Sequence, residues 1–155
     1  MIYTVVFLVH SWLRWIALAA IVGRIGKALA DRAAERPYDK KARGMTAATV
    51  GVLDLMLVLG LTLLFWLSPI TTAAMADMGS AMGDPLRRFW LVEHPTAMFL
   101  AVTIGHFVSV RAKRMDDAKR AHTHVAIGLS LTLLLILVAI PWPFRDLIGR
   151  PLFAL

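Results

Sequence analysis

Residues 121–144 read AHTHVAIGLSLTLLLILVAIPWPF, a stretch that contains no Asp, Glu, Lys or Arg. A second charge-free stretch covers residues 55–76. Two further apolar stretches, residues 3–23 and 89–110, are charged only at Arg14 and at Glu93. Because about 20 consecutive apolar residues in a helix cross the hydrocarbon core of a bilayer, the four stretches predict four transmembrane helices.

The composition excludes an ordinary soluble protein. Of the 155 residues, 59% are hydrophobic and 17% are charged, whereas soluble domains carry about 25% charged residues. The length fits a single domain. The absence of cysteine excludes disulfides, thiolate ligands and a covalently attached c-type haem. Any metal must therefore be held by histidine, methionine or carboxylate side chains.

The net charge of +7 is distributed as in a membrane protein. Twelve of the basic residues lie in the first and third connections between the apolar stretches, and four lie in the second connection and the C-terminal tail. Lys and Arg are enriched in cytoplasmic loops, so the asymmetry predicts that both termini lie on the non-cytoplasmic side of a bacterial inner membrane. No nucleic-acid-binding fold or base-stacking pattern accompanies these charges, and we expect no nucleic-acid partner.

The expected architecture is all-α: an up-down-up-down four-helix bundle in the membrane, with helices over residues 3–36, 46–68, 85–114 and 119–140. Pro37 is expected to stop the first helix, because proline lacks the backbone N–H that a helix needs. Asp84-Pro85 is a typical helix start, with Asp as the N-cap. Residues 70–83 show no periodicity and are expected to form a linker.

Histidines in the first and third helices define the candidate site. His10 and Arg14 lie on one helix face because they are four residues apart. Counted from the expected outer ends, the depths of His10 and His94 differ by about 3 Å. Helices 1 and 3 are diagonal partners in such a bundle, so the two imidazoles could be the axial ligands of a b-type haem. Arg14 is expected to need an anionic partner, either a haem propionate or Glu93.

Two alternatives stay open from the sequence. His10 and Arg14 could be purely structural, with His10 bonding a neighbouring helix and Arg14 neutralising Glu93. Pro95 could also begin the third helix, which would place His94 at the membrane surface as a cap and remove the match in depth. The longer helix is favoured, with Pro95 bending it and freeing the carbonyl of Leu91.

A second cluster lies nearer the basic connections. His106 is the candidate ligand of a second site, together with His122 or His124. The last two residues point about 200° apart on a helix and cannot easily share one ion, so a second haem or metal is not the favoured interpretation, and both are taken as interfacial. Asp54 stands in an apolar run and is expected to be protonated unless His106 or a lysine meets it.

Three motifs resemble a family of small bacterial four-helix membrane proteins that are labelled uncharacterised or cytochrome b-like. They are His10-Ser-Trp-Leu-Arg-Trp15, Val92-Glu-His94 and Ala139-Ile-Pro-Trp-Pro-Phe144. The resemblance extends over nearly the whole chain and implies that His10, Arg14 and His94 act together. It also implies that relatives carry a histidine near position 54, where this chain has Asp54.

The first functional hypothesis is therefore a haem b protein that passes electrons within the inner membrane, with a quinone as the electron donor. The second is a cofactor-free accessory subunit that packs against a larger membrane complex. A transporter or membrane enzyme that works through Asp54, His106 and Arg14 is a third hypothesis. An electron carrier or an accessory subunit is favoured over an enzyme.

Overall fold

The computed structural model describes residues 1–153, and its long helices are four in number. They are α1 (Ile2–Ala33), α2 (Lys40–Thr62) continued by the π-helical turn η1 (Leu63–Leu67), α5 (Pro85–Arg88) continued through η2 (Phe89–Glu93) into α6 (His94–Lys113), and α7 (Ala118–Ala139). Each of the four is long and apolar enough to cross a membrane. The expected all-α architecture with four such helices is confirmed.

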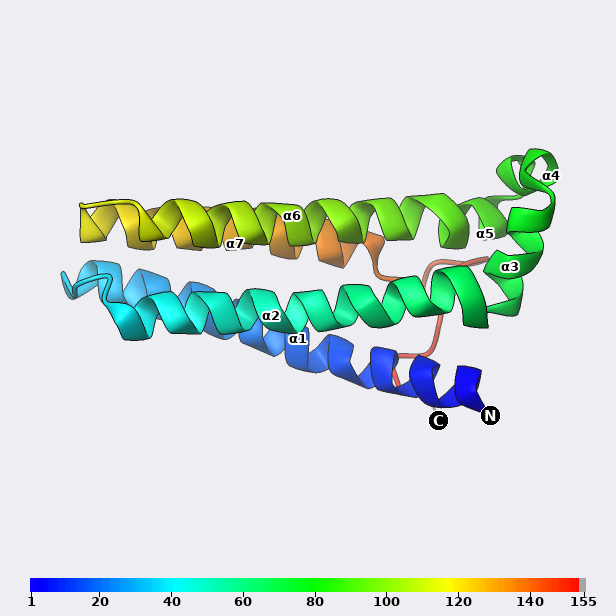
Figure 1. Cartoon of the computed structure of the whole chain (residues 1–155), viewed down its shortest axis with the longest axis horizontal. Coiled ribbons are helices and arrows are strands. Elements are labelled where there is room, and N and C mark those ends of the chain that lie inside the picture. The colour runs from blue at the N-terminus through cyan, green and yellow to red at the C-terminus, as the bar shows by residue number, and fades with distance from the viewer. Residues whose placement is uncertain (154–155) are drawn as a thin grey trace.

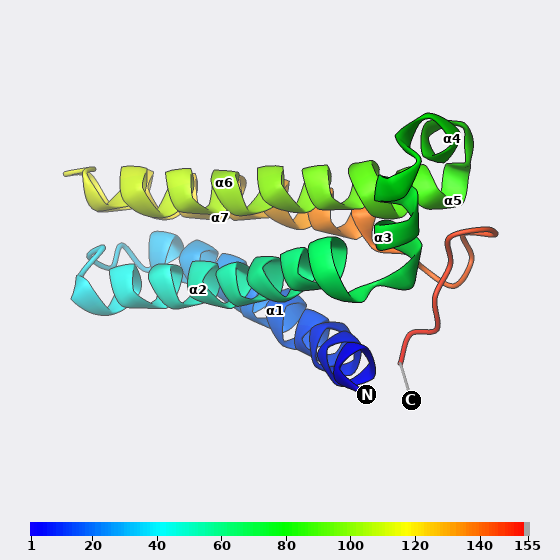
Figure 2. The same cartoon turned by 45° about the vertical axis from the view of Figure 1, so that its right-hand side comes forward.

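The four helices form an antiparallel ring in which α1 and α6 are diagonal (Figure 1). The main contacts of α1 are with α2 and α7, and α6 also packs mainly against α2 and α7. The N-terminal half of α1 diverges from the other helices, and the segment after α7 runs down toward the N-terminus (Figure 2). The bundle is therefore tightly packed at the end with the basic connections and spread apart at the opposite end.

The third membrane helix continues through Pro95, as the longer of the two alternatives predicts. Asp84 caps it, accepting hydrogen bonds from the backbone N–H groups of Leu86 and Arg87 at 2.9 and 3.3 Å. The turn before Pro95 is π-helical, and the N–H of His94 bonds the carbonyl of Phe89. A π-helical turn rearranges the hydrogen bonds locally, which lets the helix accommodate the proline without ending.

The first connection differs from the expectation that the helix runs to Arg36. The helix ends at Ala33, and Glu35 takes a left-handed conformation with φ 51°. The N–H of Arg36 then bonds the carbonyl of Asp31 at 2.9 Å, a pattern that closes many helix C-termini. The next helix begins at Lys40 rather than near residue 46, because the Asp39 side chain caps it by accepting a bond from the N–H of Ala42.

The outer connection, expected to be an irregular linker, is helical. It contains the short helices α3 (Pro69–Ala76) and α4 (Met78–Gly83). The side chain of Ser68 caps α3, with Pro69 at the first helical position, and the side chain of Asp77 caps α4. Side-chain caps, in α3 together with a proline at the first position, favour a helix start without any apolar periodicity, and this explains why periodicity alone missed both helices.

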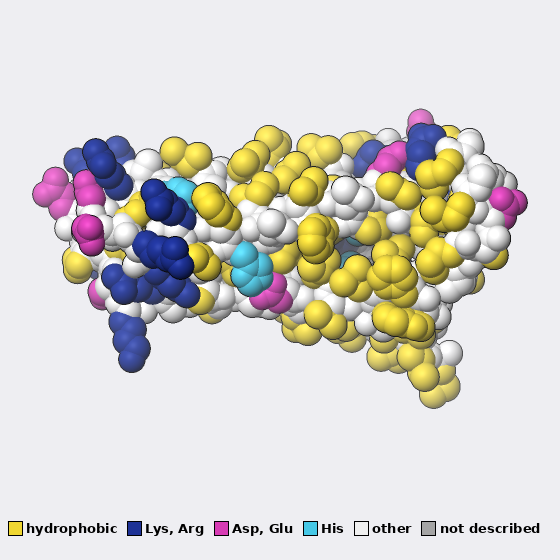
Figure 3. Space-filling model, turned by 45° about the horizontal axis from the view of Figure 1, so that its top comes forward, with side chains coloured by type: hydrophobic (Ala, Val, Ile, Leu, Met, Phe, Trp, Pro, Cys, Tyr) yellow, Lys and Arg dark blue, Asp and Glu magenta, His cyan; other side chains and the backbone are white. Residues whose placement is uncertain are grey.

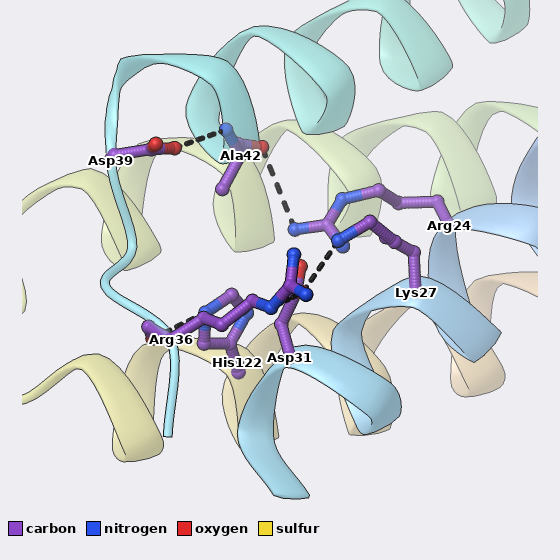
Figure 4. Close-up of polar contacts among 7 residues, drawn as sticks. All are labelled: Arg24, Lys27, Asp31, Arg36, Asp39, Ala42 and His122. Carbon is purple, nitrogen blue, oxygen red and sulfur yellow. Dashed lines mark hydrogen bonds and ion pairs between the residues drawn. The ribbon is translucent and has the colours of Figure 1, made fainter. Parts of the chain in front are cut away.

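Arg24 is the arginine that the bundle buries most completely. Only 2% of its surface is exposed, although the sequence singled out Arg14 as the charge most in need of a partner. Arg24 Nε donates to the Thr46 hydroxyl at 2.9 Å, and that oxygen is also 3.0 Å from the Tyr38 hydroxyl. Figure 4 shows Arg24 reaching from α1 toward Ala42 at the start of α2. This network ties the first two helices together at the basic end.

Candidate functional site

A cavity of about 520 Å³ lies among α1, α2, α6 and α7, in the half of the bundle where α1 diverges. Its walls are mostly apolar, and a few polar groups converge on it. The residues that matter here are His10, Arg14, Gly60, Trp90, His94, Arg150 and Phe153. Ligand pockets of proteins usually have about 300–1,000 Å³ and a mostly apolar lining with few polar groups, so this cavity has the character of a binding site.

His94 is held in a defined orientation at the cavity. Its Nδ1 is 2.9 Å from the backbone carbonyl of Ala139 at the end of α7, so Nδ1 carries the hydrogen and donates it. Nε2 is then the acceptor nitrogen. Metal-binding histidines are commonly held by such a bond from the other ring nitrogen. The ring also contacts Phe89 and Trp90, with centroid distances of 5.8 and 5.7 Å.

His10 reaches the same cavity from the opposite helix of the diagonal. Its Nδ1 is buried and has no hydrogen-bond partner, while the ring faces the backbone of Met56. A Cβ atom placed on Gly60 would lie 3.3 Å from Cε1 of His10, so the glycine makes room for the ring against α2. His10 and His94 both line this cavity, so the two histidines share one site, as their matched depths predict.

Arg14 contacts the C-terminal segment at the edge of the cavity. Nη2 donates to the carbonyl of Leu152 at 2.7 Å, and Trp15 Nε1 donates to the same oxygen at 3.2 Å. The guanidinium also lies 5.2 Å from the centre of the Trp15 ring, and its Nε is buried without a partner. A second arginine, Arg150, stacks over Trp90 at 5.3 Å. Neither arginine forms an ion pair within residues 1–153.

The expected contact between Arg14 and Glu93 is absent from the described residues. Glu93 instead accepts a hydrogen bond from Arg88 Nε at 2.8 Å, and about half of its side chain is exposed. The physical reason is its position in the π-helical turn η2: Glu93 lies outside the cavity lining, although His94 directly after it is part of that lining. Glu93 is thus next to His94 in the chain, but its side chain does not line the cavity.

The second expected site does not form inside the bundle. His106 lies on the outer face of α6, where its Nε2 is 2.7 Å from Oδ1 of Asp54. His122, which was taken as interfacial, is fully buried and bonds the carbonyl of Arg36 at 3.2 Å. Within residues 1–153 no group of three or more His, Cys, Asp or Glu side chains could hold a metal ion. In the described residues His106 therefore pairs with Asp54, and His122 bonds the carbonyl of Arg36 instead of joining it.

Two parts of the site were not found in the sequence. The C-terminal residues Arg150 and Phe153 line the cavity, and no local pattern indicates that a segment after the last helix folds back onto the first. Gly60 gave a weak signal, because a glycine inside a helix often marks a close approach of another group.

The fold and the cavity together define a four-helix protein of membrane type with a ligand-sized cavity in one half. In comparisons with family models, curated proteins and solved structures, nothing matched this chain.

Proposed function

We propose that this chain binds one b-type haem in the cavity and transfers electrons within a membrane. The observation that carries the proposal is the convergence of His10 and His94 on one apolar cavity from two diagonal helices. Within residues 1–153, Nδ1 of His10 and Nε2 of His94 make no hydrogen bond. Histidines on facing helices of a bundle are a common way to bind a haem iron.

The residues around the cavity fit such a group. The bond from Nδ1 of His94 to the carbonyl of Ala139 leaves Nε2 as a ligand atom and fixes the ring orientation. The buried Nδ1 of His10 has no partner, which is unfavourable in an apolar surrounding unless something else satisfies the ring. The mostly apolar walls would keep water from the iron.

Arg14 and Arg150 supply positive charge for the two propionates. A guanidinium matches a carboxylate in geometry and charge. Arg14 is half-buried, and its guanidinium meets the carbonyl of Leu152 and the ring of Trp15 but no anion within residues 1–153, so a carboxylate would be a stronger partner. Arg150 also lines the cavity, where it lies over Trp90, and could serve the second propionate.

A haem held by His10 and His94 would supply one-electron redox chemistry. With both histidines as ligands, no position on the iron would remain for a substrate. This is why the proposal is electron transfer rather than an enzymatic reaction at the iron. A quinone is a suitable electron donor in the membrane.

We also propose a location in the bacterial inner membrane, with the basic connections in the cytoplasm and both termini on the other side. The twelve-to-four distribution of basic residues supports this orientation. The basic side chains gather at one end of the molecule (Figure 3). Alkaline phosphatase fused after Leu155 should be active, and green fluorescent protein at the same point should be dark. The reverse result would overturn the orientation.

The haem proposal is tested by the absorption spectrum of the protein purified in detergent. We expect a reduced-minus-oxidised α-band and a low-spin spectrum. His10→Ala and His94→Ala should each abolish the band or make the haem high-spin, whereas His124→Ala should keep both content and spin state. His124 is the matched control because it is a histidine of α7 outside the cavity lining.

Two results would overturn the proposal. One is equal haem content in all three variants, which would remove His10 and His94 as ligands. The other is a stable but colourless wild-type protein after expression with sufficient haem, which would favour the second hypothesis, a cofactor-free accessory subunit.

A further inference from the structure

Asp54 and His106 form a polar pair on the outer face of the bundle. Their side chains are 43% and 54% exposed, and the bond between Nε2 and Oδ1 is 2.7 Å long. Asp54 lies 14 residues after Lys40 and 13 before Leu67, at the middle of one of the four membrane-type helices. The pair therefore faces outward at a level where the surroundings are lipid.

The neighbours of the pair on this face are mainly apolar. They include Leu55 and Val58 on α2 and Phe107 and Val110 on α6, all exposed. In Figure 3 a histidine and an acidic side chain touch near the middle of the molecule, with hydrophobic side chains on the side away from the basic end. Ionisable side chains in a membrane segment are costly in contact with lipid and almost always face protein or water. A protein surface is therefore expected to cover this pair.

The hydrogen-bonding groups that remain on the pair identify the partner. Within residues 1–153, Oδ2 of Asp54 and Nδ1 of His106 make no hydrogen bond. In a pair without net charge, one of these two atoms carries a hydrogen and donates, and the other accepts. The pair thus offers one free acceptor and one free donor side by side, and this set is complementary to itself.

We infer that this face binds a second copy of the chain, giving a two-fold symmetric dimer in the membrane. Nδ1–H of His106 in each copy donates to Oδ2 of Asp54 in the other copy. The two pairs then form a closed ring of four hydrogen bonds with no net charge. A two-fold interface requires a self-complementary patch, and the Asp54–His106 pair meets that requirement.

The backbone near the pair permits close approach. Gly51 lies one turn from Asp54, and nothing lies within 4 Å of a Cβ atom built on it. Ala47 and Ala48 are also exposed, one to two turns away. Small residues at the contact between membrane helices let the backbones come close, which favours association. In the dimer, α2 of one copy packs against α6 of the other.

Because the chain has no cysteine, single cysteines can test the dimer in native membranes. Val58 and Thr103 lie one turn from Asp54 and His106 on the same helix faces, and both are exposed. Full-length chains with Val58→Cys and chains with Thr103→Cys, carrying different tags, are produced together and treated with a short bis-maleimide. We expect a covalent dimer that carries both tags.

The matched control replaces Thr103→Cys by Leu134→Cys. Leu134 is exposed on α7 and lies at a similar distance from the basic end as Val58, but not on the α2–α6 face. We expect little cross-linking for this combination. Equal yields for the two combinations, or no cross-linked dimer in either, would overturn the inference, as would a cross-link from this face only to a different membrane protein.

A second measurement tests the polar pair itself. Asp54→Asn and His106→Gln should each lower the dimer association constant by about tenfold or more, because the loss affects two symmetric hydrogen bonds. Exchange of the two residues, Asp54→His with His106→Asp, keeps the complementary set and should restore dimerisation. Unchanged association in both single variants would remove the pair as the basis of the dimer. Thermal unfolding in detergent is measured for each variant and reports whether it folds.

Discussion

Arg14 and Leu152 are joined by a hydrogen bond of 2.7 Å from the guanidinium to the backbone carbonyl, across 138 positions of the chain. The bond connects the first helix to the segment that follows the last one. Phe153 adds to the connection, because its ring lies 5.3 Å from that of Trp12 and 5.5 Å from that of Trp15. The C-terminal segment therefore forms part of the cavity wall at a point where α1 diverges from the bundle.

Replacing Arg14 should release this segment. In Arg14→Leu the carbonyl of Leu152 loses its strongest donor and keeps only the longer bond from Trp15 Nε1. A spin label attached to Leu152→Cys should become clearly more mobile in the electron paramagnetic resonance spectrum. Arg87→Leu is the control, since Arg87 pairs with Asp84 in the outer connection. Equal label mobility in both backgrounds would show that Arg14 does not hold the segment.

Arg24 should matter more for stability than an exposed arginine of the same helix. Arg24→Leu removes the bonds to Thr46 and to the carbonyl of Ala42 in a fully buried position. We expect the free energy of unfolding to fall by about 2 kcal/mol, in the range for lost buried hydrogen bonds. Arg32→Leu, an exposed change in the last turn of α1, should alter it by less than about 0.5 kcal/mol. Thermal unfolding in detergent compares the two variants. Similar losses in the free energy of unfolding would contradict a stabilising role of the hydrogen bonds of Arg24.

Gly60→Ala should disturb the site through His10 alone. The added methyl group would lie 3.3 Å from Cε1 of His10, so the ring has to shift by a few tenths of an ångström. We expect an altered haem spectrum or a lower haem affinity. In Gly23→Ala the new methyl group meets nothing within 4 Å, and the better helix propensity should stabilise the protein by about 0.5–1 kcal/mol. An unchanged spectrum in Gly60→Ala would show that His10 is not held against α2 in the haem-bound protein.

Gly128 and Val108 should be coupled in a double-mutant cycle. A Cβ atom on Gly128 would lie 2.1 Å from Cγ2 of Val108, so α6 and α7 can pack this closely only with glycine there. Gly128→Ala should destabilise by about 1–3 kcal/mol. With Val108→Ala the methyl groups no longer collide, so the double variant should be more stable than the sum of the single effects predicts. Strict additivity in chemical denaturation would contradict the close contact.

The helical bundle was predictable because it rests on local properties of the chain. Four apolar stretches set the number of helices, and Asp84-Pro85 marked a helix start that the structure confirms. The convergence of His10 and His94 also followed, because short connections fix the neighbours of each helix and the rise per residue fixes the depth. The helix ends were less accurate where a cap, such as Asp39 or Asp77, determined them instead of periodicity.

The misjudged residues all depend on long-range contacts. Arg14 and Arg24 are both in the first helix, and only the packing of α2 decides that the second is buried and the first is half-exposed. Glu93 is adjacent to His94 in sequence, yet the π-helical turn leaves it outside the cavity lining and bonded to Arg88. Residue spacing does not predict the direction of a side chain in an irregular turn. It also does not predict that a C-terminal segment folds back onto the first helix.

The buried Arg24 also fixes α1 against α2 at the basic end of the bundle. His10 lies 14 residues before it in the sequence, which is about 21 Å along the helix axis. A rocking motion of α1 by about 5° around that point therefore carries His10 by about 2 Å, by simple lever arithmetic on the helix rise. The position of His10 at the cavity is thus sensitive to the angle at which α1 packs at the basic end, where Ile21 and Arg24 are buried.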